Sequence, residues 1–71
     1  MIIRLSAKSY RIDDVYSQVK TTILANNGVL VEHGVISDSM YIVSEIRGTP
    51  TLDLIKKILK NYSITEFELS I

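Results

Sequence analysis

Residues 2–7 read Ile-Ile-Arg-Leu-Ser-Ala, and this stretch decides the fold. Its apolar residues Ile3, Leu5 and Ala7 alternate with polar ones, which is the period-two pattern of a strand with one buried face. Residues 65–71, Thr-Glu-Phe-Glu-Leu-Ser-Ile, repeat the alternation. Both ends of the chain are therefore predicted to be half-buried strands.

A helix is predicted directly after the first strand. Its apolar stripe, at spacings of three and four, consists of Ile12, Val15, Tyr16, Val19 and Ile23. We expect Asp13 or Asp14 to cap its N-terminus, because a carboxylate accepts the unpaired amide protons there. The run Asn26-Asn27-Gly28 should end the helix, since Asn and Gly tolerate a left-handed backbone.

A second helix is predicted before the last strand. Gly48 breaks the chain, and Thr49-Pro50 is a typical helix start because proline at the first helical position loses no hydrogen bond. The buried stripe is formed by Leu52, Ile55, Ile58, Leu59 and Tyr62, and the outward face by Lys56, Lys57 and Lys60.

Two β-branched runs, Val29 to Ser37 and Met40 to Arg47, are predicted to form a hairpin around Asp38. The order is then strand, helix, strand, strand, helix, strand. With one apolar stripe on each helix, this order favours an α+β ferredoxin-like βαββαβ sandwich, with two helices on one face of a four-stranded antiparallel sheet. The 71 residues predict a single domain, 1–71.

The other sheet face is expected to stay uncovered. Its predicted residues are Ile2, Arg4, Glu66 and Glu68, together with Tyr41, Val43, Glu45 and Arg47 or the complementary set of the middle strands. A mixed face of this kind suits a protein partner. A chain this short buries little surface, and without a disulfide its stability is marginal. We therefore also expect a homo-oligomer, because association would increase that stability.

Composition excludes several functions. Eight Lys and Arg balance eight Asp and Glu, so no field gathers phosphates and nucleic-acid binding is disfavoured. The absence of Cys fits a reducing cytoplasm, where we expect the protein to be located. Arg4 interrupts the opening apolar residues, so neither a signal peptide nor a membrane span is predicted.

No catalytic or metal chemistry is predicted, and no cofactor. His33 is the one histidine and cannot provide a zinc site alone. The pair Asp13 and Asp14 is interpreted as a helix cap, and the pair Glu66 and Glu68 as a solvated strand face. The isolated glycines do not form a phosphate loop.

Gly34 lies inside a predicted strand, where glycine lowers stability. It marks either a β-bulge or a place where a ligand or another backbone comes close, and the sequence leaves both alternatives open.

The segment Lys8-Ser9-Tyr10-Arg11 combines two cations with an aromatic ring, which could contact a phosphate or a base. Sheet-based RNA readers place aromatic side chains on their central strands, and here only Tyr41 meets that pattern. RNA binding is therefore a minor alternative, and a solvated connection the simpler interpretation.

Similarity to a known family covers residues 15–20, residues 29–34, the predicted third strand and the stretch from Leu52 to Leu69. These segments resemble the short regulators associated with iron-only hydrogenase systems, within the ACT-like group of small-molecule-sensing domains. Arg4-Leu5-Ser6, His33-Gly34 and Arg47-Gly48 are similar to the NIL domain of methionine-importer ATPases.

Met40 to Gly48 is similar to the C-terminal domain of nickel-responsive repressors. Met40 stands where that family has its cysteine ligand, so nickel sensing is not implied.

The resemblance implies a non-enzymatic regulatory domain, of the kind found in transcriptional control, that binds a small effector such as an amino acid at an oligomer interface. It places ligand contacts at Ser6, Lys8 and Ser9, with Gly34 beside them. The alternatives are a protein-interaction module that uses the open sheet face or a strand edge, and an RNA-binding domain.

Overall fold

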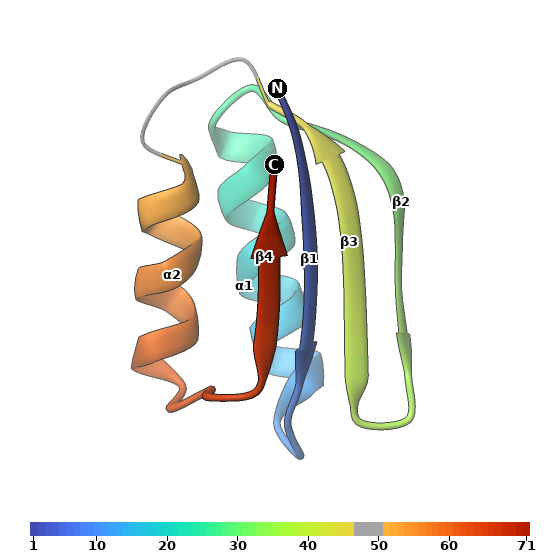
Figure 1. Ribbon diagram of the computed structural model, residues 1–71, viewed down its shortest axis with the longest axis vertical. Coiled ribbons are helices and arrows are strands. Elements are labelled where there is room, and N and C mark those ends of the chain that lie inside the picture. The colour runs from blue at the N-terminus through green and yellow to red at the C-terminus, as the bar shows by residue number, and fades with distance from the viewer. Residues whose placement is uncertain (47–50) are drawn as a thin grey trace.

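The computed structural model describes residues 1–46 and 51–71 (Figure 1). Its elements are, in order, β1 (Ile2–Lys8), α1 (Ile12–Ala25), β2 (Val29–Ile36), β3 (Ser39–Glu45), α2 (Thr51–Asn61) and β4 (Phe67–Ser70). The predicted order of strands and helices is confirmed. The predicted strand end at Arg47, the break at Gly48 and the helix start at Thr49-Pro50 lie outside the described residues.

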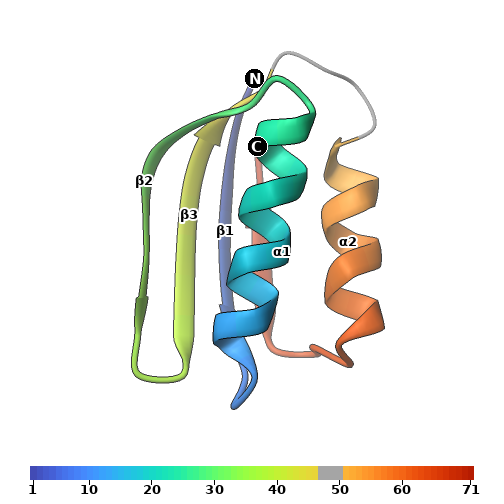
Figure 2. The same cartoon turned by 180° about the vertical axis from the view of Figure 1, so that it is seen from behind.

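The four strands form one antiparallel sheet in the order β2-β3-β1-β4. Helices α1 and α2 lie side by side on one face of this sheet, and the other face is open (Figures 1 and 2). The chain therefore has the predicted α+β ferredoxin-like fold. Within residues 1–46 and 51–71, no helix has the length and apolar character needed to cross a membrane.

The core lies between the sheet and the helices. Both predicted stripes reach it, and its buried apolar residues are Ile3, Leu5, Ala7, Ile12, Val15, Val19, Ile23, Met40, Ile42, Ile46, Ile55, Leu59 and Ile64. Phe67 lies opposite Ala7 on the helix-facing side, as expected, but 40% of it stays exposed because β4 is a short edge strand. The alternating apolar residues of β1, Ile3, Leu5 and Ala7, thus lie at the centre of the core.

The register decides which residues of β3 face outward. Tyr41 pairs with Ser6, and Val43 pairs with Arg4, so these β3 residues share the open face with the polar residues of β1. Of the two sets of middle-strand residues predicted for the open face, the set with Tyr41, Val43 and Glu45 is therefore the one that lies there. The alternate residues Met40, Ile42 and Ser44 are buried.

The N-terminus of α1 differs from the prediction. The cap position is Arg11, without a side-chain cap, and Asp13 and Asp14 lie in the first turn. The predicted carboxylate cap is wrong because the connection from β1 to α1 is short. The Arg11 amide donates a hydrogen bond to the Ser9 Oγ at 3.1 Å, and this contact turns the chain into the helix. The two carboxylates still lie at the positive end of the helix dipole.

Gly34 is not at a bulge. The register shift of β2 lies between Leu30 and Glu32, and no glycine in the described part of the chain has a positive φ. Gly34 instead pairs with Tyr41, whose ring lies over it: a Cβ at Gly34 would be 2.8 Å from the Tyr41 hydroxyl oxygen and 3.0 Å from its ring carbon Cζ. The close approach is therefore made by a side chain of the same molecule.

Candidate functional site

Three connections converge at one end of the sheet: residues 9–11 between β1 and α1, residues 37–38 between β2 and β3, and residues 62–66 between α2 and β4 (Figure 1). Two backbone hydrogen bonds join them. The Ser9 amide donates to the Asp38 carbonyl at 2.9 Å, and the Lys8 amide donates to the Glu66 carbonyl at 3.0 Å. We call this region the three-loop end.

The turns that form the three-loop end are fixed locally. Ser37 has a φ of 55° in the two-residue hairpin turn, and Ser63 has a φ of 57° after α2. The Ile64 amide then donates to the Leu59 carbonyl at 2.9 Å, which ends the helix, and the Ile64 side chain enters the core. The next residues are thereby directed back toward β1.

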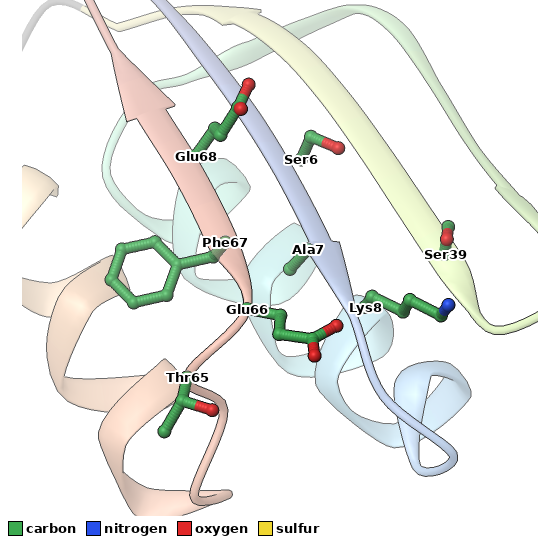
Figure 3. Close-up of a pocket in the computed structure, with 8 residues that line it drawn as sticks. All are labelled: Ser6, Ala7, Lys8, Ser39, Thr65, Glu66, Phe67 and Glu68. Carbon is green, nitrogen blue, oxygen red and sulfur yellow. The ribbon is translucent and has the colours of Figure 1, made fainter.

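An open depression of about 410 Å³ lies on the sheet at this end. Lys8, Glu66 and Glu68 line it with charged groups, and Ser6, Ser39 and Thr65 line it with hydroxyls. Figure 3 shows the Glu66 carboxylate projecting toward β1 and the Lys8 ammonium extending toward Ser39, while Phe67 points away from the depression. One positive and two negative side chains thus surround a single space.

A second depression, of about 300 Å³, adjoins the first. The two share Lys8, Thr65 and Glu66, and the second adds Tyr10 and Asp38, among others. Tyr10 is 88% exposed, so its ring stands in solvent with little packing to hold it. An exposed ring of this kind gives a ligand an apolar and aromatic surface.

Three of the four predicted ligand contacts come together here. Ser6 and Lys8 line the first depression, and Lys8 and Ser9 line the second. A third depression, of about 280 Å³, extends from Ser6 to Tyr41. Gly34 lines none of these three and lies one strand farther across the sheet, beyond Tyr41. The structure does not bring it to the other predicted contacts.

The sequence interpretation does not include Asp38, Ser39 and Thr65 in this site. It identifies Asp38 only as a turn residue, and Glu66 only as part of a solvated strand face. Their approach to Lys8 follows from the antiparallel register of β1 with β3 and β4. The signal that could have found them is the rule that hairpin turns and returning loops meet at the same edge of such a sheet.

His33 lies elsewhere, on the helix-facing side of β2. Its Nδ1 shares a hydrogen bond with the Tyr16 hydroxyl, and the Lys20 ammonium lies 4.9 Å from the centroid of the Tyr16 ring. This contact joins α1 to the edge strand. In the part of the chain that the structure describes, no group of three or more His, Cys, Asp or Glu residues is placed to hold a metal ion.

No protein-family model matches this sequence, and no curated protein is significantly similar to it. The ACT-like resemblance therefore stays a prediction.

Proposed function

We propose that this chain is a non-enzymatic regulatory domain whose three-loop end binds a free amino acid. One observation carries the proposal: Lys8 lines the same depression as Glu66 and Glu68. An amino acid carries a carboxylate and an ammonium a few ångströms apart, so a site that holds a cation beside an anion can pair with both groups. The depression is open to solvent, so its charged side chains rather than enclosure would hold the ligand.

The remaining groups suit such a ligand. Lys8 would pair with the ligand carboxylate, and Glu66 or Glu68 with its ammonium. The hydroxyls of Ser6 and Thr65 can donate or accept the further hydrogen bonds. His33 is on the opposite face of the sheet and does not take part in this site.

We propose a second copy of this chain as the partner, at the outer edge of β2. This edge strand has eight residues, with the charge of Glu32 and a bulge between Leu30 and Glu32 but without Lys or Pro, and its Val29, Val31 and Ile36 are 60%, 64% and 67% exposed. Natural edge strands are usually shortened, charged or covered, because unpaired backbone groups invite another strand. An antiparallel pair of two β2 strands satisfies a two-fold axis, so one edge can serve both copies.

The edge and the ligand site are connected through the β2–β3 turn. Asp38 lies two residues beyond the end of β2, its carbonyl accepts the hydrogen bond from the Ser9 amide, and it also lines the second depression. A ligand that orders this turn would also order the end of β2. Effector binding and association are therefore expected to strengthen each other.

A thermal-shift screen against the proteinogenic amino acids tests the binding proposal. At about ten times its Kd, a ligand adds about 1.4 kcal/mol of stability, which raises the Tm by about 5 °C or more in a domain of this size. Lys8→Ala should abolish the shift, and the matched control Lys57→Ala, on the exposed face of α2, should retain it. The proposal is wrong if no amino acid raises the Tm, or if Lys8→Ala responds like the control.

Light scattering at micromolar concentration tests the partner. We expect about twice the chain mass of 8.0 kDa for the wild type. Val31→Lys places a charge in the middle of the exposed edge and should give a folded monomer, whereas Asn61→Lys at the end of α2 should remain a dimer. A wild-type monomer with intact circular dichroism would contradict the proposal.

A further inference from the structure

We infer that Asn27 is a modification site, at which the chain converts the side-chain amide to a carboxylate without an enzyme, and that the folded end of α1 controls the rate. The reaction is deamidation through attack by the Gly28 backbone nitrogen. The site is in the turn between α1 and β2, at the end of the sheet opposite the three-loop end (Figure 2). The inference does not depend on the proposed function.

The geometry of the turn favours this pair of residues. Asn27 has a φ of 62°, a left-handed conformation that asparagine and glycine adopt more readily than other residues. A Cβ at Gly28 would be 2.6 Å from the Ile23 carbonyl oxygen and would also overlap the Ile23 side chain, so only glycine fits there. The end of α1 is therefore built from Asn-Gly, the dipeptide that deamidates fastest, because glycine leaves the attacking nitrogen unshielded.

The reaction needs only water as a co-reactant. The Gly28 nitrogen loses its proton and attacks the side-chain amide carbon of Asn27. A carbon–nitrogen bond forms, the bond to the side-chain nitrogen breaks, and that nitrogen leaves with the proton as ammonia. Water then opens the resulting five-membered imide at one of its two carbonyl groups. One opening gives aspartate, and the other gives isoaspartate, in which the main chain runs through the former side chain.

Contacts at the end of α1 oppose the first step. The Gly28 amide donates a hydrogen bond to the Ile23 carbonyl at 2.9 Å, so its proton is held, and Gly28 is buried although Asn27 is exposed. The Asn26 side chain donates to the Thr22 carbonyl at 2.8 Å and ties the preceding residue to the last turn of the helix. Attack therefore requires this end to open, and helix ends open more often than the rest of a fold.

The products change the charge and the backbone of the turn. Aspartate at position 27 takes the formal net charge of the chain from 0 to −1 and places the new charge at the negative end of the α1 dipole. Isoaspartate also adds a methylene group to the main chain, which alters the geometry of the hydrogen bond between Gly28 and Ile23. Because β2 begins at Val29, both products weaken the junction between the helix and the edge strand.

Peptide mapping by mass spectrometry tests the inference, with folded and urea-unfolded protein incubated side by side at mildly alkaline pH. We expect deamidation of Asn27 to be at least about tenfold slower in the folded protein. In urea, Asn27 should react well before Asn26 and Asn61, which precede bulkier residues. The rate in urea should rise with pH, because the attacking nitrogen must lose its proton.

Two variants assign the control to the end of α1. Asn26→Ala removes the hydrogen bond to the Thr22 carbonyl, so Asn27 should deamidate about threefold faster in the folded variant than in the folded wild type. In urea the two rates should be equal. The matched control Asn61→Ala, at the end of α2, should keep the wild-type rate in the folded state. Circular dichroism verifies that both variants fold.

Three results would overturn the inference. Equal rates at Asn27 in the folded and unfolded protein would show that the helix end does not control the reaction. Earlier deamidation of Asn26 or Asn61 in urea would show that the site is elsewhere. A folded-state rate that is the same in Asn26→Ala as in Asn61→Ala would remove the assigned contact as the cause.

Discussion

Strands β1 and β2 differ in burial although both are rich in apolar residues. In β1 every second residue is buried, and Ile3, Leu5 and Ala7 are each at most 3% exposed. In β2, one residue longer, no residue is fully buried, and Val31 is 64% exposed. The reason is position, because β1 lies between β3 and β4 whereas β2 is at one edge of the sheet.

This difference shows what an apolar strand does when its fold leaves it at an edge. The apolar residues of β1 stabilise the isolated domain, since the helices cover them. In β2, Leu30 and Val35 pack against the core, whereas Val29, Val31 and Ile36 stay exposed and are available for association. Substitutions of the same kind in the two strands should therefore affect different properties.

The largest expected effect comes from Leu5→Ala in β1. Removal of a buried leucine side chain leaves a cavity and should lower the free energy of unfolding by about 2 to 5 kcal/mol, which is a large part of the stability of a domain this small. Val31→Ala in β2 should change it by about 0.5 kcal/mol or less, because the side chain is mostly exposed. Chemical denaturation of the monomer, at concentrations below dimerisation, measures both. Equal losses would show that Val31 contributes to the core as much as Leu5 does.

Gly34 gives the next largest effect, through the ring of Tyr41. The extended backbone accepts the valine of Gly34→Val without strain, but the new side chain meets the Tyr41 ring, whose hydroxyl oxygen would be 2.8 Å from Cβ. In a Tyr41→Ala background the same substitution should stabilise the strand by up to about 1 kcal/mol, since valine favours strands. We expect a coupling free energy of about 1 kcal/mol from the double-mutant cycle. Additive effects would mean that the ring does not restrict this position.

Ser44 of β3 lies between the two strands, paired with Ile3 on one side and Leu30 on the other. It is fully buried, and its Oγ has no hydrogen-bond partner among residues 1–46 and 51–71. Ser44→Ala should therefore raise the free energy of unfolding by about 0.5 to 1 kcal/mol, because it removes an unpaired buried hydroxyl. A loss of stability in thermal denaturation would reveal a partner for that hydroxyl.

The smallest effect is expected where α1 contacts β2. Tyr16→Phe removes the hydrogen bond to His33 but keeps the ring, and His33 is exposed, so the loss should be about 0.5 kcal/mol. Amide hydrogen exchange should be faster at residues 32–35 of β2 and unchanged in β1. Faster exchange in both strands would contradict the prediction that the Tyr16–His33 contact stabilises β2 without affecting β1.

Sequence periodicity is enough to predict the element order, both helix stripes and the buried face of β1. These features depend on spacing along one strand or helix, which a sequence contains directly. The burial of β2 cannot be predicted in the same way, since β-branched residues look alike in a central and an edge strand. The position of the bulge at Val31, rather than at Gly34, also depends on pairing with β3.

The residues of the candidate site also fall into two groups, those that can be named from the sequence and those that only the folded sheet brings together. Ser6, Lys8 and Ser9 are consecutive or nearly so, and the resemblance alone places them together. Asp38 and Thr65 are distant in sequence and reach Lys8 only through the antiparallel register. A local pattern cannot indicate such neighbours, because their proximity is a property of the whole sheet.

Mapping by NMR tests the central claim, amino-acid binding at the three-loop end, most directly. On titration of the ¹⁵N-labelled protein with the amino acid that raises the Tm most in the thermal-shift screen, we expect saturable shift changes at the amides of Lys8, Ser9, Asp38 and Glu66. The amides of Lys56 and Lys57 on the exposed face of α2 should stay unchanged. Absence of saturable changes, or changes centred on α2, would contradict the account.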